Sequence, residues 1–113
     1  MFTYAIIYAD GTDSVFMSEK APDYDTLNKA VGGWLEGVAL VGVTAYVNEE
    51  GKLMNLPVNA LATRLAHRDE AIYPQDTING HMIVLGALDD DGEFTSLSDE
   101  WIRVNLTSVG QLA

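Results

Sequence analysis

The stretch from residue 48 to residue 59, Asn-Glu-Glu-Gly-Lys-Leu-Met-Asn-Leu-Pro-Val-Asn, most constrains how this chain can fold. We call residues 48–59 the central segment. Gly51 predicts a tight turn, from which residues 52–54 are expected to pair back as a strand. Pro57 has no main-chain N–H and therefore excludes a central strand at its position. Asn59 is a candidate helix N-cap, because its short side chain can accept a hydrogen bond from a free helical N–H group.

Two pairs of strands are predicted in the part of the chain that precedes the central segment. Residues 1–9 are rich in aromatic and β-branched side chains, and residues 14–18 continue that composition after a turn at Gly11. The two stretches are therefore expected to form an antiparallel hairpin. Residues 34–40 and 43–47 have a similar composition and are expected to form two further strands.

Three short helices are predicted where apolar residues recur with the spacing of one helical face. The expected helices cover residues 24–31, 59–66 and 98–106. Each has a capping side chain at or near its start: Asp23 or Asp25 for the first, Asn59 for the second and Ser98 for the third. Residues 107–113 are expected to fray, since chain ends are rarely tied down.

A late apolar run completes the expected fold. Residues 81–86 are typical of a strand that is covered on both faces, and residues 93–95 are expected to pair as a short strand after an acidic turn. Alternating strand and helix signals over a chain of 113 residues predict one α+β domain, residues 1–113. Its sheet is expected to be mostly antiparallel, with two or three short helices packed on it.

Charge limits the classes of partner. Seventeen acids oppose six bases, for a net charge of −11. Nucleic acid and anionic membranes are therefore poor partners, because both are bound through basic surfaces. A protein with a basic surface suits the charge, although acidity that serves only solubility is the plainer interpretation. The chain has no cysteine and no apolar stretch long enough to cross a bilayer, so we expect a soluble, cytoplasmic protein.

Three segments in this order resemble a family of small phage, plasmid and bacterial proteins known only as a domain of unknown function. They are Val-Gly-Gly-Trp-Leu-Glu at 31–36, Asn-Glu-Glu-Gly-Lys-Leu at 48–53 with Leu-Pro-Val-Asn at 56–59, and Ile-Asn-Gly at 78–80. The resemblance implies a compact α+β domain that is often encoded on mobile elements, and it brings no established catalytic residue. His81 departs from the pattern, because a small or acidic residue is expected at that position.

Motifs for catalysis or metal binding are not found. Placing Gly92 at the sixth position of an EF-hand loop puts Ala87 first and Ser98 last, so both end ligands are missing. His67 and His81 lack the spacing of a zinc site. There is no nucleophile elbow and no phosphate-binding loop. We therefore expect no cofactor, no metal and no enzymatic activity.

With catalytic and metal-binding motifs missing, binding of a ligand or partner is the role that the sequence leaves open. The central segment offers polar contacts that can read a nucleobase, a phosphate or a peptide backbone. The candidates are Asn48, Glu49, Asn55 and Asn59 in that segment, with Arg64, Arg68 and Tyr73 beyond it. For each asparagine a purely structural role as turn or cap is equally consistent with the sequence. Trp34 and Trp101 are expected to pack in the core.

Three functions are compatible with these observations. In the first, an accessory protein of a phage or mobile element blocks a host component, such as one of antiviral defence, through an acidic face. That face would comprise Asp89, Asp90, Asp91, Glu93, Asp99 and Glu100. In the second, a homo-oligomer sequesters a small signalling nucleotide, with Tyr73, Arg64 and Arg68 as stacking and phosphate contacts. In the third, the domain is structural or regulatory and binds no ligand.

Overall fold

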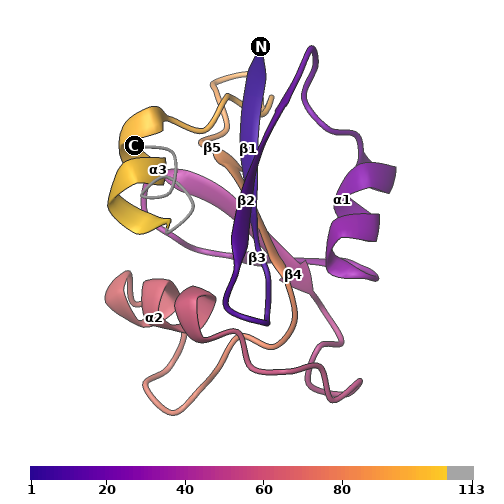
Figure 1. Cartoon of the computed structure of the whole chain (residues 1–113), viewed down its shortest axis with the longest axis vertical. Coiled ribbons are helices and arrows are strands. Elements are labelled where there is room, and N and C mark those ends of the chain that lie inside the picture. The colour runs from indigo at the N-terminus through magenta and orange to yellow at the C-terminus, as the bar shows by residue number, and fades with distance from the viewer. Residues whose placement is uncertain (107–113) are drawn as a thin grey trace.

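The computed structural model describes residues 1–106, so the expected fraying of residues 107–113 lies outside it. The protein is an α+β domain with a five-stranded antiparallel sheet and three helices (Figure 1). The elements are β1 (Phe2–Ile7), β2 (Asp13–Ser18), α1 (Tyr24–Val31), β3 (Leu35–Val38), β4 (Val43–Asn48), α2 (Ala60–Arg68), β5 (Met82–Gly86) and α3 (Asp99–Asn105). The predicted fold class is confirmed.

The last strand of the chain lies in the centre of the sheet. The strand order is β2-β1-β5-β4-β3, and β5 pairs antiparallel with both neighbours. Ile83 faces Ile6 on one side and Tyr46 on the other. Every residue of β5 is buried, which agrees with its uninterrupted apolar sequence. The β1–β2 and β3–β4 hairpins are thus joined in the sheet by β5, a strand that follows both of them in the sequence.

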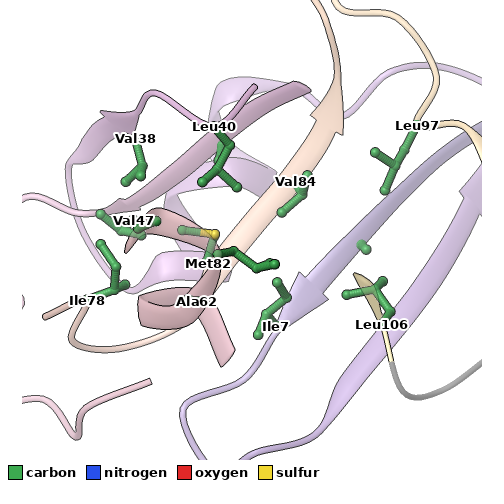
Figure 2. Close-up of a cluster of buried hydrophobic side chains, with 14 of the residues drawn as sticks. Ile7, Val38, Leu40, Val47, Ala62, Ile78, Met82, Val84, Leu97 and Leu106 are labelled. Atoms are coloured by element: carbon green, nitrogen blue, oxygen red, sulfur yellow. The ribbon is translucent and has the colours of Figure 1, made fainter. Parts of the chain in front are cut away.

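Helices cover both faces of the sheet. In Figure 1, α1 lies on one side of the strands, and α2 and α3 lie on the other. Alternate side chains of β1 divide between the two faces: Ala5 and Ile7 join the larger cluster, and Tyr4 and Ile6 line the smaller one under α1. Figure 2 shows the larger cluster, in which side chains of the sheet meet Ala62 of α2.

Caps set where the helices begin and end. The Asp23 side chain accepts from the N–H of Thr26 at 2.9 Å and starts α1, which ends at Gly32 with φ +80°. The hydroxyl of Ser98 accepts from the N–H of Trp101 at 3.1 Å and starts α3. Each capping group satisfies an N–H that the first helical turn leaves without an internal partner.

Some expectations about individual segments were wrong. Residues 52–54 do not pair back as a strand, because the chain after Gly51 makes consecutive turns, with the Met54 N–H donating to Glu50 O at 2.9 Å. Trp34 is 69% exposed, so it does not pack in the core as expected. Residues 93–95 make a single bridge, Leu88 to Phe94, rather than a strand.

Candidate functional site

Two asparagines of the central segment are buried parts of the scaffold. The Asn48 amide donates to Val31 O at 3.2 Å, and its side-chain oxygen accepts from the Glu50 N–H at 2.8 Å. Asn48 is 4% exposed, so it joins the end of β4 to the end of α1 and offers little to a ligand.

Asn59 uses both ends of its amide inside the protein. Its oxygen accepts from the Ala62 N–H at 3.1 Å, which confirms the predicted cap of α2. Its nitrogen donates to Ile7 O at 2.9 Å and to Gly80 O at 3.0 Å. The side chain is fully buried. Asn59 therefore fixes α2 to the sheet and cannot contact a ligand without breaking these bonds.

The rest of the central segment is held against the loop before β5. A Cβ added at Gly51 would lie 2.5 Å from the Asn79 carbonyl oxygen, so only glycine permits this close approach. Lys52 forms an ion pair with Asp76. Asn55 is exposed and occupies the left-handed region with φ +54°, a conformation that asparagine tolerates better than most residues. The segment is thus tied to the loop before β5 at Gly51 and at Lys52.

The proposed nucleotide contacts lie on α2 and in the loop that follows it. Arg68 donates to both carboxylate oxygens of Asp69 and, at 2.5 Å, to Asn105 of α3. Tyr73 is 74% exposed and lines a hollow of about 460 Å³ with His67 and neighbours in its own loop. Arg64 is exposed on α2. The hollow at Tyr73 is lined by neither arginine and by no residue of the central segment.

The acidic turn, which we define as Asp89, Asp90, Asp91 and Glu93, is exposed between β5 and α3. One oxygen of Asp89 accepts from the N–H groups of Asp91 and Glu93, both at 2.9 Å, and this shapes the turn. Asp99 and Glu100 are exposed in the first turn of α3.

None of these six carboxylates belongs to an ion pair within the part of the chain that the structure describes. The ion pairs there join Lys29 to Asp25, Lys52 to Asp76 and Arg68 to Asp69. The six side chains are therefore exposed carboxylates without an ion-pair partner among the described residues.

Both histidine rings are engaged by main-chain groups. Nδ1 of His81 accepts from the Ala9 N–H at 3.0 Å, and the ring meets Tyr8 edge-on. Nε2 of His67 lies 2.9 Å from the Asp76 carbonyl oxygen. Within residues 1–106, no three His, Cys, Asp or Glu side chains are grouped to hold a metal ion, and no helix is long and apolar enough to cross a membrane.

A further exposed surface lies at the edge of the sheet formed by β3. Tyr24 and Trp34 are 70% and 69% exposed and line a hollow of about 370 Å³ together with Glu49. A second hollow, of about 130 Å³, is lined by Glu36, Glu49 and Asp76, among others. A signal was present in the sequence: Glu36 is the only charge in its predicted strand, which is typical of an edge.

Neither the curated proteins nor the solved structures include a match to this chain. One family does match, over residues 4–109, and it is described as Domain of unknown function (DUF3846). This agrees with the resemblance carried by the central segment and the segments that flank it. Because the match covers nearly the whole sequence, the chain belongs to the family Domain of unknown function (DUF3846).

Proposed function

We propose that this domain is a non-enzymatic binding protein that blocks a basic surface on a partner protein of the host. The observation that carries the proposal is the set of six exposed carboxylates on the acidic turn and the start of α3, none of which is in an ion pair within residues 1–106. An uncompensated charge of one sign attracts a surface of the opposite sign and excludes surfaces of its own sign.

The fold gives these carboxylates a fixed frame. The Leu97 N–H donates to Thr3 O at 2.8 Å, and the Gly86 N–H donates to Thr95 O at 2.9 Å, so the chain on either side of the turn is bonded to the sheet or its end. A charged surface held in one shape loses less conformational entropy on binding than a mobile tail does.

We propose in addition where the protein acts and which kind of host component it blocks. The resemblance to proteins of phages and plasmids supports an accessory role on a mobile element, acting in the host cytoplasm, and a component of antiviral defence is the target that suits that setting. The nucleotide-sequestering alternative is less well supported, because Arg68 is bonded to Asp69 and Asn105 instead of facing the central segment.

The test is capture from host lysate followed by quantitative binding of the captured protein. The test variant neutralises the acidic turn through Asp89→Asn, Asp90→Asn, Asp91→Asn and Glu93→Gln. The matched control removes as many exposed charges elsewhere, through Glu19→Gln, Asp25→Asn, Glu50→Gln and Glu70→Gln.

We expect the test variant to bind at least about tenfold more weakly and the control to bind nearly as well as the wild type, and wild-type affinity should fall steeply as salt screens the charges. Binding that is insensitive to salt, or an equal loss in both variants, contradicts the proposal. Copurification of a nucleotide instead of a protein favours the sequestering alternative.

A further inference from the structure

We propose that the free edge of β3 accepts an extended, basic peptide segment of a partner as an added strand. Among the described residues, 1–106, β3 is the last strand on its side of the sheet and pairs only with β4. Antiparallel pairs alternate between hydrogen-bonded and outward-facing residues. The Glu49 N–H donates to Trp34 O at 2.9 Å, which fixes the phase of this alternation and turns the N–H and C=O groups of Leu35 and Gly37 toward the free side.

The edge is open to an approaching backbone. Glu36 and Gly37 are exposed, and a Cβ built on Gly37 meets nothing within 4 Å, so no side chain crowds the face of the strand at that point. The other outward-facing residue, Leu35, packs under α1, which holds its main chain in place. The main chain of both residues already has the extended conformation of a strand. Binding of an added strand therefore costs no conformational entropy in β3.

Two hollows flank this edge on opposite faces of the sheet. The hollow lined by Tyr24 and Trp34 includes Leu35, which packs in the cluster under α1. The hollow lined by Glu36 and Asp76 includes Val38, which packs in the cluster with α2. Glu49 lines both hollows. Successive side chains of an added strand point to alternate faces, so each hollow would receive every second side chain.

The charge of the hollows beside β3 favours a basic peptide as the added strand. The smaller hollow has three carboxylates, Glu36, Glu49 and Asp76, and one base, Lys52, which is already paired with Asp76. Lysine or arginine side chains suit that hollow, and apolar or cationic side chains suit the exposed faces of the two aromatic rings in the other. A second copy of this chain fits poorly, because antiparallel pairing of two β3 edges brings like charges at Glu36 close together.

This inference does not depend on the acidic turn, since it uses other residues and main-chain recognition. The probe is a fluorescent peptide of about ten residues that alternates lysine and valine, a length that suits one strand. One control peptide replaces lysine with glutamate. A second control keeps the lysines but carries N-methyl groups on alternate amides, so it has the same charge but cannot pair as a strand. Binding is followed by fluorescence anisotropy and by amide NMR shifts of Leu35 and Gly37.

We expect the lysine peptide to shift both amides and to bind at least about tenfold more tightly than either control. Gly37→Pro removes one outward N–H and should abolish binding, whereas Gly37→Ala keeps the N–H. If the proline variant does not fold, the pair Glu36→Lys and Glu49→Lys tests the same edge and should also abolish binding. The acidic-turn variant should bind the peptide nearly as well as the wild type.

Three outcomes overturn the inference. One is equal binding of the N-methylated peptide, which indicates attraction by charge alone. Another is unchanged binding when the Glu36 and Glu49 charges are reversed. The third is a dimer in solution that is lost in the Gly37→Pro variant, which assigns the edge to a second copy of the chain.

Discussion

The side-chain nitrogen of Asn59 donates to the carbonyl oxygen of Ile7 at 2.9 Å and so joins the start of α2 to the end of β1. The two residues are 52 positions apart in sequence. The bond lies in a fully buried place, where an unpaired carbonyl would lose its hydration without compensation. One side chain therefore both starts a helix and sets that helix on the sheet.

Replacement of Asn59 by alanine should lower the free energy of unfolding by about 3 kcal/mol, because it removes a helix cap and the buried hydrogen bonds that the side-chain nitrogen donates to Ile7 O and Gly80 O. Asn59→Asp keeps the capping acceptor but loses both donors, so it should also destabilise the protein. Urea denaturation measures both changes. As a control, Asn55→Gly lies at a left-handed, exposed position and should change stability by less than about 0.5 kcal/mol. Equal effects at Asn59 and Asn55 would contradict the assigned roles.

A glycine in the central segment is required by close packing. Gly51→Ala places a methyl group 2.5 Å from the Asn79 carbonyl oxygen and should cost roughly 1–3 kcal/mol as the two segments move apart. Gly37→Ala is the matched control, because a Cβ there meets nothing within 4 Å and alanine is less flexible when unfolded. We expect the control to be neutral or slightly stabilising in thermal unfolding. A Gly51→Ala variant as stable as the wild type would show that the contact can relax freely.

The Arg68–Asp69 pair should make stability depend on pH. The side-chain hydrogen bond from Arg68, and after it the Val41 N–H, lowers the pKa of the Asp69 carboxyl below its usual value. A carboxyl whose pKa is lowered by folding stabilises the protein above its unfolded pKa, and that contribution is lost as pH falls through the folded pKa. Asp69→Asn should therefore flatten the acid limb of the stability curve.

At neutral pH we expect Asp69→Asn to cost at most about 1 kcal/mol, since the charge-assisted hydrogen bond that it weakens has an Arg68 partner that is 47% exposed and screened by solvent. Asp90→Asn, on the exposed acidic turn, should leave stability at neutral pH unchanged. Chemical denaturation over a series of acidic pH values tests both. An acid limb with the same slope in Asp69→Asn as in the wild type would show that Asp69 makes no such contribution.

Local signals predicted the helices well. The bounds of α1 agree with the predicted range, and Asn59 and Ser98 cap as expected, because a cap depends on a few adjacent residues. The place of β5 between β1 and β4 could not be predicted in the same way, because it depends on pairing between segments that are far apart in sequence.

The candidate site was harder to predict than the fold. An asparagine that caps a turn and an asparagine that binds a ligand look the same in a sequence. The burial of Asn48 and Asn59 in the structure is what assigns them a structural role. The prediction for Trp34 failed for a related reason. A large aromatic residue favours burial, but Trp34 lies beside the edge strand β3, where no further strand within residues 1–106 covers it.

The exposure of Trp34 can be measured directly, because the chain has only one other tryptophan, Trp101, which is partly buried against the larger core cluster. Acrylamide, an uncharged quencher, reaches exposed indoles more readily than buried ones. We expect the fluorescence of Trp101→Phe, which retains Trp34, to be quenched strongly, and that of Trp34→Phe to be quenched weakly. Trp34→Phe should also leave the free energy of unfolding within about 0.5 kcal/mol of the wild type, since an exposed side chain contributes little packing. Equal quenching of the two variants would place Trp34 in a more protected environment than its 69% exposed surface implies.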